Sequence, residues 1–287
     1  MDEQLVQAIV LGIVQGLTEF LPVSSSGHLI VVPALLGWHD PFIESLAFSV
    51  MLHVATLLAL LIYFARDWVR LIPAGLAALR DRSFRDRSGA VDPDRRLAWL
   101  LAASTVPAVI VGVLLNDLIE TAFREPRLVA MTLVVGAVVL WLADGIGART
   151  RRLESLGFGA AIGIGVAQAL ALIPGVSRSG MSISAGLFAG LDREAAARFA
   201  FLMATPITAG AGLWEIRKII SGEAGVDLPI VPLLAGMLAA LGAGLVAIAI
   251  LMRYLRSHGV GIFVAYRLAL AALVLVAWLG LWDRPVG

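Results

Sequence analysis

Cysteine is absent from this chain of 287 residues. Disulfides, thiolate catalysis and cysteine-ligated metals are therefore excluded. Charged residues are scarce, at 15% of the chain, and the arginines crowd a few connecting segments instead of forming one basic face, so we expect no nucleic-acid partner. A signal-peptide pattern is also missing, because Asp2 and Glu3 stand where Lys or Arg would be found and no small-residue cleavage pattern follows. We expect the first apolar segment to remain in the mature protein.

What the chain has in abundance is apolar sequence. Hydrophobic residues make up 60% of it, and its mean hydropathy is +0.92. These values are typical of a polytopic all-α membrane protein, and we predict a single membrane domain over residues 1–287. Six stretches are apolar and long enough to span a bilayer: Phe42–Ala65, Leu97–Leu115, Leu128–Ala143, Phe199–Ile216, Ile230–Met252 and Ile262–Trp282.

Two further apolar stretches are interrupted. Leu5–Leu21 runs into Pro22–His28, which we name the first loop, and Leu156–Ile173 is followed by Gly175–Met181, the second loop. Both loops are rich in Ser and Gly and lead into another short apolar stretch. Polar non-helical backbone at membrane depth is tolerated where it is buried in protein or lines a watery cavity, so the pattern predicts two re-entrant helix-loop-helix segments around a site.

The two interrupted segments are copies of each other at an offset of 153 residues. Identical pairs at that offset include Ala8 and Ala161, Gly12 and Gly165, Gln15 and Gln168, Val23 and Val176, Ser24 and Ser177, Ser26 and Ser179, Gly27 and Gly180, Gly37 and Gly190, and Phe48 and Phe201. We interpret this as a duplication, with repeat 1 over about residues 1–150 and repeat 2 over about 151–287. Two ordinary helix hairpins are the alternative.

Each repeat holds one re-entrant segment and three spans, and an odd number of crossings inverts the second copy. Eight arginines fall in Arg66–Arg96, three in Gly145–Ser155 and two in Arg253–Gly261. The positive-inside rule places these segments in the cytoplasm, with both termini and the mouth of the first loop on the outer, periplasmic side. The charged loop over residues 66–96 is interpreted as a solvated linker in preference to a binder of anionic lipid headgroups.

The candidate chemistry starts on the first interrupted helix. Gly12, Gln15, Gly16 and Glu19 share one helical face that is small and polar. An ionisable side chain costs at least about 2.5 kcal/mol at the centre of a bilayer, which makes Glu19 a functional candidate. A structural Glu19, hydrogen-bonded to backbone or to a neighbouring helix, is the alternative.

Both loops have the composition of an anion site. Hydroxyl groups and flexible amides precede a helix in each, and the residues concerned are Ser24, Ser25, Ser26 and Gly27 in the first and Ser177, Ser179, Gly180 and Ser182 in and after the second. The second loop adds Arg178, whose planar guanidinium binds phosphate oxygens in pairs. Arg178 aligns with Ser25, while Glu19 and His28 align with Leu172 and Met181. The halves thus supply different groups to one centre, a set suited to phosphoryl transfer.

The other histidines are weaker candidates. His39 and His258 lie near predicted helix ends, and we expect both to be interfacial. His53 lies inside a predicted span, where a structural role is favoured over a functional one.

Two long motifs together resemble a known family. The segments Gln15–His28 and Pro174–Gly180 resemble the bacitracin-resistance type of undecaprenyl-pyrophosphate phosphatase, and the likeness covers essentially the whole chain. The resemblance implies an enzyme of the bacterial inner membrane that hydrolyses undecaprenyl pyrophosphate to undecaprenyl phosphate and inorganic phosphate. This reaction recycles the lipid carrier for peptidoglycan and other envelope polymers, and overproduction confers bacitracin resistance.

The resemblance also implies site residues and a metal. The family's acidic motif falls on Gln15 and Glu19, with Ser25 and His28 following, and its phosphate-binding arginine falls on Arg178. Gln15 replaces a frequent Glu and Ser182 a usual Thr, so a second carboxylate for metal is missing. The family's requirement for Mg²⁺ or Ca²⁺ places the ion at Glu19, with Gln15 as a weaker ligand.

The nucleophile is left open. Ser25, deprotonated by Glu19 or His28, is preferred, while a phosphorylated His28 and a metal-bound water are the rivals, and Ser24 or Ser26 can replace Ser25. A lipid-phosphate flippase or anion transporter would use the same inverted repeats, but it needs no nucleophile beside a base. A structural scaffold would not explain the buried polar residues. A homodimer is possible for this fold.

Overall fold

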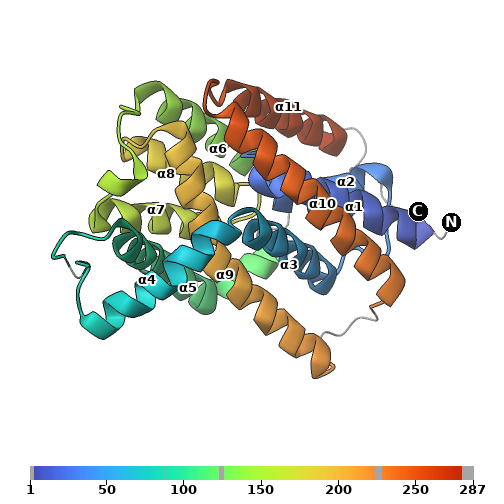
Figure 1. The fold of residues 1–287 in the computed structure, drawn as a ribbon. Helices are drawn as coiled ribbons and strands as arrows, with labels where there is room; N and C mark the ends of the chain where they lie inside the picture. Colours follow the sequence, from blue (N-terminus) through green and yellow to red (C-terminus); the bar gives the residue numbers. More distant parts are fainter. Residues whose placement is uncertain (1–2, 87, 123–125, 224–227, 280–287) are drawn as a thin grey trace.

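The chain is built from α-helices (Figure 1). The computed structural model describes residues 3–86, 88–122, 126–223 and 228–279. Within these ranges there are eleven α-helices, one short 3₁₀ helix and no β-strand. The helices are α1 (Glu3–Phe20), α2 (Ser25–Leu36), α3 (Leu46–Tyr63), α4 (Ala65–Asp81), α5 (Pro93–Ala122), α6 (Pro126–Ile146), α7 (Phe158–Leu170), α8 (Arg178–Phe188), α9 (Arg193–Ile220), α10 (Ile230–Tyr254) and α11 (Gly261–Ala277).

Five helices are long and apolar enough to cross a membrane: α3, the Pro93–Leu114 part of α5, Arg127–Ile146 in α6, α9 and α10. They coincide with five of the six predicted spans, so the prediction of a multi-pass helical membrane protein is confirmed at this level. The sixth predicted span corresponds to α11, an apolar helix of 17 residues. The predicted end of that span, Trp282, lies outside the described residues.

The two interrupted segments have matching backbones. Helix α1 ends before the first loop and α7 before the second, and in each case a serine then caps a new helix. The Oγ of Ser24 accepts a hydrogen bond from the amide of Gly27 at the start of α2, and the Oγ of Ser177 accepts one from Gly180 at the start of α8. Such caps satisfy amides that have no partner within the helix. Both serines have a positive φ, 74° and 75°.

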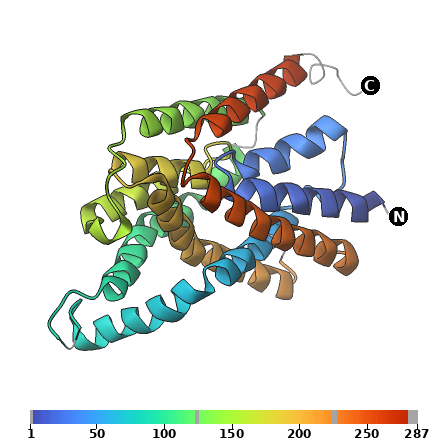
Figure 2. The same cartoon turned by 45° about the horizontal axis from the view of Figure 1, so that its top comes forward.

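Small residues let the first helix of each segment approach a long span closely. A Cβ on Gly12 of α1 would lie 2.1 Å from the carbonyl oxygen of Gly236 in α10, and one on Gly165 of α7 would lie 2.0 Å from that of Ser104 in α5. The turned view shows α1 alongside α10 (Figure 2). Each interrupted segment is therefore held against a span from the other half of the chain.

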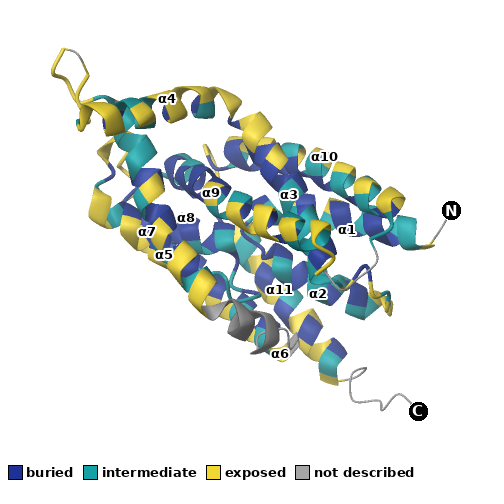
Figure 3. Cartoon of the chain, turned by 90° about the horizontal axis from the view of Figure 1, so that it is seen from below, coloured by how far each residue is buried: buried dark blue, intermediate teal, exposed yellow. Residues whose placement is uncertain are grey.

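The arginine-rich segment is not a linker along its whole length. Residues 65–81 form α4, and α5 already begins at Pro93, so most of the segment is helical. In the connection between the two helices, the amide of Asp92 donates to the carbonyl oxygen of Phe84 at 2.8 Å. Leu71 and Ala78 of α4 are buried, which the alternation of Arg and Asp in the sequence concealed. Figure 3 shows the rest of α4 mostly exposed at the edge of the molecule.

Candidate active site

Glu19, at the end of α1, is the centre of the polar contacts between the two loops. Its side chain is only 9% exposed. The Oε1 atom accepts a hydrogen bond from Nη2 of Arg178, and Oε2 accepts one of 2.5 Å from Oγ of Ser25. The structure thus brings together three of the four residues predicted to be catalytic, one from α1 and one from the first turn of each capped helix.

The serine caps position these groups. Ser25 directly follows the cap residue Ser24, and Arg178 directly follows Ser177, so each functional side chain is the first residue of its helix. The loops also contact each other, since Oγ of Ser179 donates to the carbonyl oxygen of Leu21 at 3.0 Å. The two caps and this bond fix Ser25 and Arg178 on either side of Glu19.

Three further side chains complete the surroundings of Glu19. Nε2 of Gln15 donates to Oε2 at 3.1 Å, and Nε2 of His53 lies 3.4 Å from the same oxygen. Nη1 of Arg178 donates to Oγ1 of Thr208 at 3.0 Å. His53 was expected to be structural, and Thr208 was not singled out in the sequence. The available signal for His53 was its place as an ionisable residue inside an apolar span.

His53 is held beside Glu19 by its own backbone contact. Nδ1 of His53 lies 2.8 Å from the carbonyl oxygen of Ser49, which only accepts, so this nitrogen donates to it. This hydrogen bond orients the ring so that Nε2 faces the carboxylate of Glu19.

His28 has its own partners, which lead away from Glu19. Nδ1 lies 2.7 Å from the carbonyl oxygen of Ser24 and donates to it, and Nε2 lies 2.7 Å from the hydroxyl of Tyr266. The two rings are stacked, with centroids 5.7 Å apart. Among the described residues, no hydrogen bond or ion pair joins His28 to Glu19 or Ser25. This arrangement suits a residue that holds the first loop.

Most of the remaining predicted phosphate-binding residues make hydrogen bonds within their own loop. The amides of Gly27 and Gly180 are occupied by the serine caps. The hydroxyls of Ser24 and Ser26 lie 3.4 Å apart, and those of Ser177 and Ser179 lie 3.3 Å apart. Ser182, one turn into α8, is buried with no partner for its Oγ among the described atoms.

A buried arginine that the sequence analysis missed ties both loops to α6. Arg267 of α11 is fully buried. Its guanidinium donates to the carbonyl oxygens of Pro22 in the first loop, at 3.4 Å, and of Gly175 and Val176 in the second, both at 3.0 Å. Nε donates to the carbonyl oxygen of Leu133 at 3.1 Å. An arginine inside an apolar span was the available signal.

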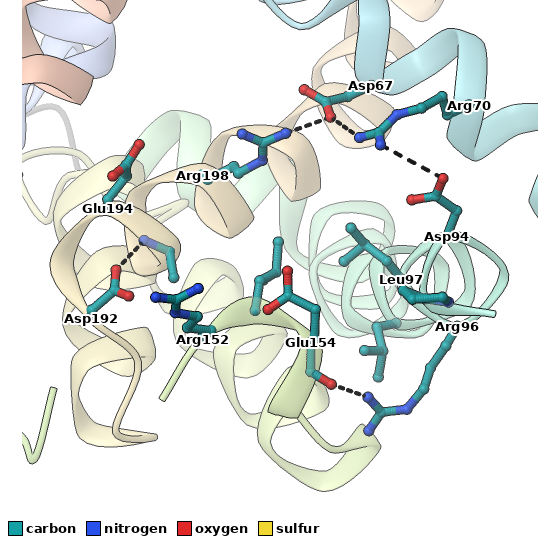
Figure 4. Close-up of a pocket in the computed structure, with 14 residues that line it drawn as sticks. Asp67, Arg70, Asp94, Arg96, Leu97, Arg152, Glu154, Asp192, Glu194 and Arg198 are labelled. Carbon is teal, nitrogen blue, oxygen red and sulfur yellow. Dashed lines mark hydrogen bonds and ion pairs between the residues drawn. The ribbon is translucent and has the colours of Figure 1, made fainter. Parts of the chain in front are cut away.

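Two cavities differ in size and in chemistry. A narrow one of about 10 Å³ lies against Glu19 and Arg178. A larger one of about 740 Å³ is lined by charged residues of α4, α5 and α9 and of the segment before α7. Figure 4 shows Asp67 between Arg70 and Arg198. The smaller cavity is lined by Glu19 and Arg178, two of the predicted catalytic residues, and it is therefore the candidate active site.

Comparison with known proteins identifies the family of this chain. The model of the family described as "Bacitracin resistance protein BacA" matches residues 8–273. A protein of Gemmatimonas aurantiaca named "Undecaprenyl-diphosphatase" is 48% identical over 268 residues, which cover 93% of this chain and 96% of the relative. Proteins of the same name from Desulforudis audaxviator and Moorella thermoacetica are each 44% identical, covering 94% and 95% of this chain and 96% and 98% of theirs. The chain belongs to the BacA family of bacitracin resistance proteins.

Proposed function

We propose that this protein hydrolyses undecaprenyl pyrophosphate to undecaprenyl phosphate and inorganic phosphate, the activity for which its relatives are named. The observation that supports this proposal most is that the carboxylate of Glu19 accepts hydrogen bonds from both the hydroxyl of Ser25 and the guanidinium of Arg178. The reaction recycles the lipid carrier of envelope polymers. A larger capacity for it counteracts bacitracin.

In the reaction we infer, Ser25 is the nucleophile. Its Oγ attacks the terminal phosphorus while its proton passes to Oε2 of Glu19. The bond from that phosphorus to the bridging oxygen breaks, and undecaprenyl phosphate leaves with the proton that Glu19 returns to it. A water molecule then attacks the phosphoserine and gives a proton to the free carboxylate of Glu19. Glu19 passes this proton to Oγ of Ser25 as the bond between phosphorus and Oγ breaks, which releases inorganic phosphate and restores Ser25. The guanidinium of Arg178 stabilises charge on the phosphoryl oxygens in both steps.

The ion pair between Glu19 and Arg178 couples substrate binding to base strength. In the absence of substrate the guanidinium stabilises the carboxylate and so weakens it as a base. A phosphate group competes for the same guanidinium, because Arg178 binds phosphate oxygens in the same planar geometry. When Arg178 turns to the substrate, Glu19 is left next to the Ser25 hydroxyl as a stronger base.

The rival nucleophiles have less geometric support. Attack by His28 requires Nε2 to leave Tyr266, and attack by a metal-bound water leaves the 2.5 Å contact between Ser25 and Glu19 unexplained. Ser24 and Ser26 contact each other instead of the carboxylate. Ser25 is therefore preferred.

The metal belongs to the proposal as a partner of Glu19. The buried Oε1 of Gln15 has no hydrogen-bond partner among the described atoms, and it stands one helical turn from the carboxylate. Glu19 and Gln15 would hold Mg²⁺ or Ca²⁺ together with substrate oxygens, sparse protein ligation of the kind that Mg²⁺ tolerates. The bound ion would neutralise charge on the pyrophosphate. No group of three His, Asp or Glu residues suited to a metal occurs in the described part of the chain.

The matching loops also support the finer architecture that we propose. Six spans and two re-entrant segments, in two inverted repeats over about residues 1–150 and 151–287, account for loops that share one backbone and meet at Glu19. In the inner membrane, the arginine-rich segments then face the cytoplasm, and both termini and the mouth of the first loop face the periplasm. A homodimer stays a prediction.

The test is phosphate release from undecaprenyl pyrophosphate by the purified protein, with added Mg²⁺ and with EDTA. We expect activity in the wild type, loss with EDTA, and loss in Glu19→Gln and in Arg178→Gln. The matched control is Glu44→Gln, whose side chain is 51% exposed and outside the site. A folded wild type that binds the lipid and releases no phosphate would overturn the proposal in favour of a flippase or anion transporter.

A further inference from the structure

Helix α4 presents an apolar strip that faces away from the protein. Asp67, Leu71 and Ala78 are buried against other helices. A second face carries Val69, Ile72, Leu76 and Leu79, which are 74%, 56%, 63% and 60% exposed. Spacings of three and four residues place these four side chains in one stripe along the helix. Exposed apolar surface of this extent requires a partner when the protein is in its native surroundings.

Contacts place α4 across the start of a span. Arg70 lies 3.9 Å from Asp94, Trp99 Nε1 donates to the carbonyl oxygen of Gly75 at 3.2 Å, and Arg95 lies 3.0 Å from Asp81. On α4 these contacts run from Arg70 to Asp81, about 16 Å along the helix axis, whereas on α5 they run from Asp94 to Trp99, about 8 Å. Helix α4 therefore crosses the end of α5 where the apolar span begins, instead of lying along it.

The connection to α3 also places α4 at the end of a span. The spanning helix α3 ends at Tyr63, and α4 begins at Ala65, so the two meet at one end of a span. Leu61 and Ile62, in the last turn of α3, are exposed apolar side chains. The strip on α4 continues this lipid-facing surface at the boundary between hydrocarbon and water. In Figure 2, α4 lies at the periphery, in cyan.

Positive charges without partners flank the strip. Arg66 lies in the first turn of α4 and Arg82 directly follows its last turn, and both are exposed. No hydrogen bond or ion pair of either side chain occurs within the residues that the structure describes. The acidic groups nearby are engaged, since Asp67 binds Arg70 and Arg198 and Asp81 binds Arg80 and Arg95. Two guanidinium groups are thus available at the level of lipid headgroups.

We propose that α4 is an interfacial helix that lies in the lipid monolayer, with Val69, Ile72, Leu76 and Leu79 among the acyl chains and with Arg66 and Arg82 bound to phosphates of anionic lipids. An amphipathic helix with apolar residues on one face and arginines beside it binds a lipid surface by both interactions. The ion pair between Asp67 and Arg198 joins another face of α4 to α9, as Figure 4 shows. The helix therefore acts as a fixed contact with the leaflet on the arginine-rich side.

Because the chain lacks cysteine, single labels can test this placement. A spin label at Leu76→Cys is compared with one at Asp81→Cys, in the whole protein reconstituted in vesicles of phosphatidylcholine and phosphatidylglycerol. Asp81 is exposed and lies five residues after Leu76, about 140° around the helix axis from it. We expect the Leu76 label to collide more with oxygen, which dissolves in lipid, and the Asp81 label more with a water-soluble nickel chelate. Equal nickel accessibility at both labels would overturn the proposal in favour of a solvated helix. Shielding of the Leu76 label from both reagents would overturn it in favour of a protein partner or a second copy.

A second experiment tests whether Arg66 and Arg82 bind anionic lipid. The Leu76 label is followed in vesicles with and without phosphatidylglycerol, in the wild-type background and with Arg66→Gln and Arg82→Gln combined. We expect anionic lipid to reduce nickel accessibility in the wild type and expect this dependence to be lost in the double variant. Arg217→Gln, at the far end of α9, is the control and should retain it. An unchanged dependence in the double variant would overturn the role of the two arginines.

Discussion

The first and second loops share a backbone and differ in chemistry. Each has a serine with a positive φ, each serine accepts a hydrogen bond from the glycine three residues later, and each loop starts a short helix. The residue that follows the serine is Ser25 in the first loop and Arg178 in the second. The first therefore supplies a hydroxyl, and the second a fixed positive charge.

This difference separates the groups that hold each loop from the groups that contact Glu19. The groups that both loops retain, the serine caps and their glycines, are used in hydrogen bonds within each loop. The groups that differ, Ser25 and Arg178, both contact Glu19, which corresponds to Leu172 in the second copy. The contacts around Glu19 are therefore asymmetric, with a hydroxyl from the first loop and a guanidinium from the second.

The largest effect is expected from the position where the loops differ. Ser25→Ala removes the proposed nucleophile, and we expect phosphate release to fall at least about 10³-fold. Ser26→Ala is the matched control in the same turn, and it should keep activity within roughly threefold because its hydroxyl does not contact Glu19. Loss of phosphate release in Ser26→Ala, with wild-type release in Ser25→Ala, would make Ser26 the nucleophile instead.

The corresponding position in the second loop comes next. Arg178→Lys keeps the charge and loses the planar arrangement that contacts Glu19 and Thr208 together, so we expect kcat to fall roughly 10²-fold to 10³-fold. The exposed Arg217→Lys serves for comparison. Initial rates at saturating lipid substrate measure the effect, and wild-type kcat in Arg178→Lys would show that charge alone is sufficient.

A smaller change in activity is expected from substitution of His53, which lies on α3, outside both loops. His53→Gln removes the imidazole beside Glu19 and leaves Ser25 and Arg178 in place, so we expect kcat to fall roughly tenfold. His39→Gln, at a side chain that is 77% exposed, should keep the wild-type kcat. A wild-type kcat in His53→Gln would show that the imidazole does not assist Glu19.

The smallest effect concerns the backbone that the loops share. Ser24→Ala and Ser177→Ala each remove a helix cap, and we expect each to lower the free energy of unfolding by about 1 kcal/mol. Ser177→Gly should cost less, because glycine adopts a φ near 75° without strain. Thermal unfolding in detergent compares the four proteins. A larger loss for glycine than for alanine would contradict the importance of the backbone conformation.

The residues of the candidate site that the sequence predicted lie in or next to the two similar loops. Ser25, Arg178 and Glu19 could be found because the loops repeat and because a carboxylate in an apolar helix is costly. His53, Thr208 and Arg267 lie on long helices, and which face of a long apolar helix points inward depends on packing against helices distant in sequence. The apolar strip of α4 was hidden for another reason, since it is interspersed with Arg and Asp in the linear sequence.

Arg267 has a consequence for motion. Its guanidinium donates hydrogen bonds to the carbonyl oxygens of Pro22, Gly175 and Val176, so one side chain of α11 links the first loop to the second. If the halves of the protein rock against each other, the loops move as one rigid piece with α11. Any movement of the lipid across the membrane would then pass around this piece, and the catalytic geometry would survive the motion.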